Sequence, residues 1–85
     1  MMKDFDLVAL TKALPEFGLA AGALGTIVDT LPRDGDTPQV FMVEFPGAND
    51  ENFEDWRVEF VEASCLQVLT PAEYKARRAR AVAAE

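Results

Sequence analysis

The first seventy residues consist of short apolar runs separated by turn-forming residues. Several of the runs are rich in β-branched and aromatic side chains, which favours strands over helices. Segments rich in glycine, proline and acidic residues lie between them, and such segments are typical of turns and loops. We therefore expect five strands, at residues 7–10, 26–31, 39–45, 56–60 and 64–68.

The run at residues 56–60 alternates cleanly between apolar and charged positions. Because successive side chains of a strand point to opposite faces, the alternation predicts that Trp56, Val58 and Phe60 point into the core. An exposed Trp56 that binds a peptide is the alternative, as in barrels that capture proline-rich segments.

Five short strands cannot bury both of their faces as a flat sheet, whereas a closed barrel can and also removes exposed edges. The sequence therefore predicts an all-β fold, a small SH3-like five-stranded barrel over residues 1–69, followed by one short C-terminal α-helix over residues 70–85. The expected core consists of Leu7, Val8, Leu10, Leu24, Ile27, Val28, Phe41, Val43, Phe45, Trp56, Val58, Phe60, Leu66 and Val68.

The segment from residue 11 to residue 25 contains one proline and three glycines, which interrupt any regular helix. Its apolar residues nonetheless favour burial, so we expect a long ordered loop that folds back on the core. Phe17 and Leu19 in this loop are candidate anchors for a protein partner. Burial over the end of the barrel is the alternative for both.

The C-terminal helix has a clear start signal. Thr70-Pro71-Ala72-Glu73 has the pattern of a capping box, with proline in the first turn. Tyr74, Arg77 and Arg78 share one face, at spacings of three and four residues. A stripe of alanines buries little area, so we expect the helix to dock weakly on its own barrel or more firmly on a partner. The arginines are candidates for partner contact or simply form a solvated face.

Charge is distributed unevenly along the chain. Eight basic and 15 acidic residues give a net charge of −7. Residues 71–85 have a net charge of +2, so the other 70 residues have a net charge of −9. Such an acidic barrel repels phosphate backbones, because nucleic-acid binding relies on cationic groups. A basic protein partner is favoured by this charge, unless the charge serves solubility alone.

The residues of common catalytic and metal sites are scarce. The chain has no histidine, so a histidine-dependent triad is excluded, and one cysteine cannot make a zinc site. Gly22-Ala23-Leu24-Gly25 lacks the ending of a phosphate-binding loop. The acidic residues 49–55 and 34–36 lack the spacing of a calcium loop, so a solvated loop and a turn are favoured over cation sites. We expect no catalytic residue, no metal and no cofactor.

The cysteine content and the hydropathy of the chain indicate where in the cell the protein is expected. The single Cys65 excludes an internal disulfide, which fits a reducing compartment, and a small buried residue is favoured over a reactive thiol there. No run of 18 apolar residues is present, and the N-terminal residues lack the apolar stretch of a signal peptide. We expect a cytoplasmic protein without a membrane partner.

Four sequence patterns resemble those of the bacterial family known as domain of unknown function 4926. They are Asp6-Leu7-Val8-Ala9-Leu10, Leu14-Pro15-Glu16-Phe17-Gly18-Leu19, Gly22-Ala23-Leu24-Gly25-Thr26-Ile27-Val28 and Phe41-Met42-Val43-Glu44-Phe45. The resemblance covers roughly residues 4–69 and implies an SH3-like barrel, but it implies no activity. In the glycine pattern, side chains at Gly22 and Gly25 are expected to clash with a neighbouring strand.

Together these observations favour a non-catalytic protein-interaction module or accessory subunit, which includes the neutraliser of a basic, toxin-like protein. A nucleic-acid-associated barrel is the alternative, and its charge disfavours it. An enzyme that works through carboxylates alone is disfavoured because a barrel this small leaves little room for a deep pocket. The candidate partner-binding residues are Phe17, Leu19, Tyr74, Arg77 and Arg78.

Overall fold

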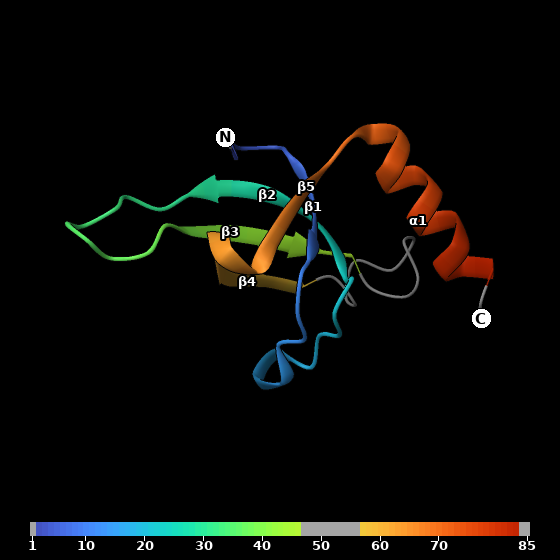
Figure 1. The fold of residues 1–85 in the computed structure, drawn as a ribbon, viewed down its shortest axis with the longest axis horizontal. Coiled ribbons are helices and arrows are strands. Elements are labelled where there is room, and N and C mark those ends of the chain that lie inside the picture. Colours follow the sequence, from blue (N-terminus) through green and yellow to red (C-terminus); the bar gives the residue numbers. More distant parts are fainter. Residues whose placement is uncertain (1, 47–56, 84–85) are drawn as a thin grey trace.

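Five antiparallel strands pair in the order β4-β3-β2-β1-β5 in the computed structural model, which describes residues 2–46 and 57–83 (Figure 1). The elements are β1 (Leu7–Leu10), η1 (Pro15–Phe17), β2 (Leu24–Thr30), β3 (Val40–Phe45), β4 (Arg57–Glu62), η3 (Ala63–Cys65), β5 (Leu66–Leu69) and α1 (Pro71–Ala83), where η marks a 3-10 turn. The first four strands form a meander, and β5 returns to pair with β1. The predicted all-β fold with one C-terminal helix is confirmed.

The sheet has two edge strands within the described residues. β4 pairs with β3 and β5 pairs with β1, and the short turn η3 joins the two edge strands along the chain. Closure of the sheet into an SH3-like barrel stays a prediction. The bounds of β1 are as expected, and those of the other strands differ by one or two residues. The difference is two residues where β2 begins at Leu24, β4 ends at Glu62 and β5 begins at Leu66.

The core lies between the inner face of the sheet and the loop after β1. The predicted core residues that the structure buries are Val8, Leu10, Ile27, Phe41, Val43, Phe45 and Leu66. The structure also buries Cys65, as expected, and adds four buried residues that the predicted core lacked, namely Ala9, Leu14, Val61 and Leu69. The predicted core residues Leu7, Leu24 and Val28 are only partly buried. Trp56 lies outside the described residues.

The predicted orientation of β4 was wrong. Val58 is 50% exposed and Phe60 is 57% exposed, whereas Val61 is 2% exposed. The reason is the pairing with β3, in which Val61 lies opposite the buried Phe41. Directly opposite residues of an antiparallel pair share a face, so the odd-numbered positions of β4 face the core and the even-numbered ones face outward.

A second exposed apolar residue corrects the expected core at the other edge of the sheet. Val68 is 45% exposed, although its partner Val8 is fully buried. β5 is an edge strand, so a side chain on it has a neighbouring strand on one flank only. Leu66 and Leu69 carry the burial of β5.

The loop between β1 and β2 is ordered and folds back on the core, as predicted. Leu14 and Leu19 exchange two backbone hydrogen bonds of 2.8 and 3.1 Å across the turn η1. The N–H of Thr11 donates to the carbonyl of Cys65 at 2.8 Å, which ties the loop to η3. Leu14 is buried, so the loop contributes directly to the core.

Gly25 lies close to strand β3. A Cβ at this position would lie 2.8 Å from Val43 Cγ1 and 2.9 Å from the carbonyl oxygen of Glu44. Both distances are shorter than real Cβ contacts, so the predicted clash at Gly25 is confirmed. At Gly22 the expectation was wrong, because no atom would lie within 4 Å of a Cβ added there; its φ of +87° is what favours glycine.

Helix α1 begins at the predicted capping box. The backbone N–H of Thr70 donates to Glu73 Oε1 at 2.9 Å, and the N–H of Glu73 donates to Thr70 Oγ1 at 3.1 Å. The helix packs against β1 and β5 of its own sheet. The sequence left docking on the sheet or on a partner open, and the structure shows docking on the sheet.

Candidate binding surface

The structure places an apolar patch on the outer face of strands β3 and β4, away from the core. We call it the outer patch and define it as Val40, Met42, Val58 and Phe60. Met42 lies directly opposite Phe60, and Val58 follows two residues away on the same face of β4. Val58 and Phe60 are exposed, while Val40 and Met42 are partly buried.

Acidic residues surround this outer patch. Glu62 lies opposite Val40, Glu44 lies opposite Val58, and Asp29 of β2 lies opposite Met42. The sole basic residue within β2, β3 and β4 is Arg57, which pairs with Phe45 on the inner face. The outer face of these three strands therefore combines exposed apolar side chains with negative charge.

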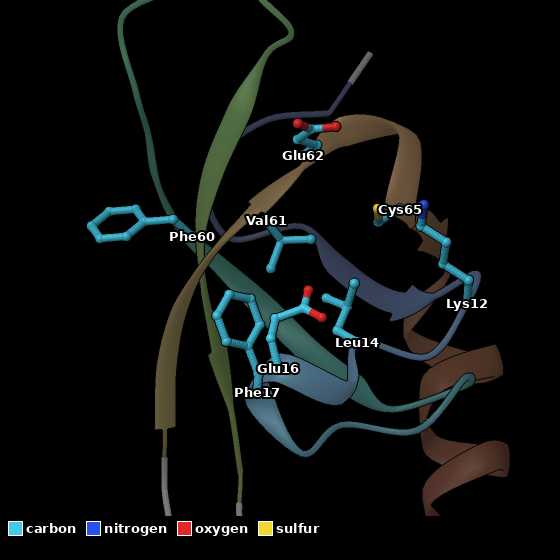
Figure 2. A pocket seen from close by; sticks show the side chains of 8 residues that line it. All are labelled: Lys12, Leu14, Glu16, Phe17, Phe60, Val61, Glu62 and Cys65. Atoms are coloured by element: carbon cyan, nitrogen blue, oxygen red, sulfur yellow. The ribbon is translucent and has the colours of Figure 1, made fainter.

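A hollow of about 270 Å³ lies beside β4, between the β1–β2 loop and η3. We call it the hollow. Its lining residues are Lys12, Leu14, Glu16, Phe17, Phe60, Val61, Glu62 and Cys65. Figure 2 shows the side chains of Leu14, Glu16, Phe17 and Val61 converging on it, while the ring of Phe60 points away. The hollow and the outer patch therefore meet along β4.

The hollow combines an apolar wall with charged groups. Leu14, Val61 and Cys65 are buried core residues, and Phe17 is partly buried against that core. Glu16 reaches the hollow from η1, as its carboxylate shows in Figure 2. Glu62 and Lys12 add one charge of each sign, so the lining carries a net charge of −1.

The predicted anchors Phe17 and Leu19 both lie in the loop that the hollow borders. Both are partly buried and pack against the core, but Phe17 lines the hollow and Leu19 does not. Phe17 therefore packs on the core, as the burial alternative expected, and also lines the hollow. Contact of either residue with a partner stays a prediction.

The predicted residues Tyr74, Arg77 and Arg78 lie on α1, away from the loop that carries Phe17 (Figure 1). All three are partly buried, and burial raises the pKa of the Tyr74 hydroxyl above its usual value of 10.0. The neighbouring alanines at 72, 76 and 79 are exposed. The structure therefore does not bring the two groups of predicted partner-binding residues together, and the role of the helix residues stays a prediction.

Sequence reasoning missed the outer patch. The alternation of residues 56–60 gave no reason to place Val58 and Phe60 outside, because the opposite face of this segment is charged. The signal that would have located them is Val61, the next apolar residue, which shifts the inward face of the strand by one position. A one-residue shift of register moves every side chain to the other face.

The acidic residues and the single cysteine are the potential metal ligands of the chain. Residues 2–46 and 57–83 contain no cluster of three cysteine, aspartate or glutamate side chains arranged to hold a metal ion. The acidic residues 49–55 lie outside the described residues. Cys65 is buried, as expected for a small apolar residue. Within the same residues, α1 is too short and too polar to cross a membrane, and no other helix spans one.

These features describe a small all-β domain with an exposed apolar patch and a hollow of about 270 Å³ beside it. A family described as Domain of unknown function (DUF4926) matches residues 4–54, from before β1 to beyond β3. The chain belongs to this family, although the match is shorter than the range of residues 4–69 that the sequence patterns suggested. Comparisons with curated proteins and with solved structures gave no match.

Proposed function

We propose that the protein is a non-catalytic interaction module, an accessory subunit that binds a basic protein partner through the outer patch. The observation that carries the proposal is the exposure of Val58 and Phe60 side by side on one strand face. Single exposed apolar residues are ordinary, but neighbouring ones on a polar surface are typical of interaction sites. A partner that covers them removes apolar area from water.

The charge around the patch supports a basic partner. Asp29, Glu44 and Glu62 flank the apolar side chains, and the chain as a whole carries −7. A rim of one sign attracts a partner of the opposite sign and disfavours others. This supports a basic partner, which includes a basic toxin-like protein that the module neutralises. A cytoplasmic location is part of the proposal and rests on the single cysteine.

The test compares three forms of the chain in affinity capture from the native host. They are the natural protein, the double variant Val58→Ser and Phe60→Ser, and the control Val68→Ser. The control also replaces a half-exposed valine on a strand, but at the opposite edge of the sheet. A captured protein is then purified, and its affinity for each form is measured by calorimetry.

The proposal predicts a basic partner that binds the natural chain and the Val68→Ser control equally. The double variant should bind at least about 100-fold more weakly, because central apolar anchors typically contribute about 2 kcal/mol or more to binding. Equal affinity of all three forms would exclude the outer patch as the binding site. Capture of nucleic acid instead of protein would favour the alternative function.

A further inference from the structure

We infer that the hollow beside β4 binds the side chain of an arginine, presented by a basic segment of the protein partner. The inference rests on the proposed partner binding and names a second contact next to the outer patch. The hollow adjoins that patch at Phe60. The ring of Phe60 points away from the hollow (Figure 2), so the patch and the hollow lie on opposite sides of the edge strand β4, and a partner that contacts both extends around this strand.

The size of the hollow fits one long side chain. Its volume of about 270 Å³ lies below the range of roughly 300–1,000 Å³ that is usual for sites of drug-sized ligands. It is open to solvent on one side, as the exposed Glu16 and Glu62 at its border indicate. A side chain of a docked partner can enter such a hollow from the solvent and contact the core residues that line it.

The lining matches both halves of an arginine side chain. Leu14, Phe17 and Val61 offer apolar surface to the aliphatic stem, and long cationic side chains commonly cover apolar surface in this way. Glu16 lies next to Phe17 in sequence and in Figure 2. A guanidinium group can therefore stack on an aromatic ring while its N–H groups donate to a carboxylate.

The two carboxylates at the hollow are available for such a bond. In the part of the chain that the structure describes, neither Glu16 nor Glu62 forms an ion pair with another described residue. Lys12 also lines the hollow, but Figure 2 places it at the opposite end from Phe17. Arginine is favoured over lysine, because its planar guanidinium both stacks on rings and bonds carboxylates in a fork.

The experiment is a titration of the full-length ¹⁵N-labelled chain followed by amide NMR. The probe is N-acetyl-arginine N-methylamide, and the citrulline and lysine analogues serve as comparisons. Citrulline keeps the shape of arginine without its charge. The same titration is repeated with the double variant Glu16→Gln and Glu62→Gln, and with the control Asp34→Asn and Asp36→Asn. The control removes the same charge from the exposed turn between β2 and β3, which lies away from the β1–β2 loop in Figure 1.

We expect the arginine probe to shift the amides of Glu16, Phe17, Val61 and Glu62 in a saturable way. The citrulline analogue and the Glu16→Gln, Glu62→Gln variant should each weaken binding about tenfold, the lysine analogue should bind more weakly than arginine, and the control should bind as the natural chain does. Unsaturated shifts spread over the acidic surface, or equal binding to both variants, would overturn the inference. Tighter binding of free arginine than of the capped probe would assign the hollow to a small molecule instead.

The outcome is separable from that of the proposed function. The titration needs neither the partner nor the outer patch, so it reports on the hollow alone. If the arginine probe does not bind but the captured partner requires Phe60, only the arginine site is refuted. If the arginine probe binds but the captured partner does not require Phe60, only the outer patch is refuted as the binding site.

Discussion

Replacement of Gly25 by alanine should destabilise the protein more than replacement of Gly22, the other glycine of the same sequence pattern. The new methyl group would lie 2.8 Å from Val43 Cγ1, 2.9 Å from the carbonyl oxygen of Glu44 and 3.0 Å from Phe45 Cδ1. Two of these contacts are to buried side chains and one is to the backbone of the paired strand. None of the three can move freely, because Val43 and Phe45 are buried and Glu44 is paired with Thr26 of β2.

The magnitude follows from two opposing terms. Overpacking a tight site costs about 1–3 kcal/mol, and the contact with a backbone carbonyl argues for the upper end. Alanine also restricts the unfolded chain, which returns about 0.4–1 kcal/mol. The net loss in the free energy of unfolding is therefore about 2 kcal/mol. For a domain of this size, that loss lowers the melting temperature by about 8–16 °C.

The assay is urea unfolding followed by circular dichroism, with Gly22→Ala as the matched control. Gly22 has a φ of +87° but no atom within 4 Å of an added Cβ. Its replacement should cost about 1 kcal/mol net, because left-handed backbone strains an alanine by about 1–2 kcal/mol and the restricted unfolded chain returns about 0.4–1 kcal/mol. If Gly25→Ala is as stable as the natural chain, or loses less stability than Gly22→Ala, then β2 and β3 do not approach each other as described.

Two further predictions concern β4 and the helix cap. Val61→Ala should lower the free energy of unfolding by about 1–3 kcal/mol because the side chain is buried. Phe60→Ser should change it by at most about 0.5 kcal/mol. The reverse order in urea unfolding would show that Phe60, and not Val61, faces the core. Thr70→Ala should cost about 1 kcal/mol through loss of the cap. The hydrogen bond from the Thr70 N–H is the main cause that lowers the pKa of Glu73 below its usual 4.5. The ionised Glu73 therefore stabilises the folded protein above pH 4.5, and this stabilisation is lost as the pH falls through the lowered pKa. Helical dichroism should therefore decline in acid, and Glu73→Gln should remove that part of the decline.

Local sequence signals were sufficient for much of the fold. The alternation around Phe41 and Val43 specified both the strand and its buried face, because β3 is central and has one apolar and one mixed face. The capping box at Thr70 and Glu73 specified the start of α1 to the residue, because it depends only on contacts three residues apart. Signals of this kind need no knowledge of the rest of the chain.

The orientation of β4 depended on contacts that no local pattern contains. Its apolar residues fall on both faces, with Val58 and Phe60 on one and Val61 on the other, so the alternation alone favours the face with more of them. Pairing of Val61 with Phe41 decides in favour of the other face. An edge strand tolerates this choice, since its outer side chains need no partner within the chain.

The candidate site was predictable only in part, for the same reason. Phe17 was identified because an apolar residue in a glycine-rich loop stands out in the sequence. Its neighbours in the hollow, Val61 and Cys65, lie more than forty residues away along the chain. The hydrogen bond from Thr11 to Cys65 brings the loop and η3 together, and nothing in either segment alone indicates it.

The most direct test of the central claim is site-specific photo-crosslinking in the native host, with a benzoylphenylalanine placed at position 60, 68 or 74 in separate experiments. These positions lie on the outer patch, on the opposite edge of the sheet and on α1. We predict that position 60 crosslinks to a basic protein and that positions 68 and 74 do not. A crosslink from position 74 alone would transfer the binding site to the helix, and crosslinks from none of the three would contradict the interaction module itself.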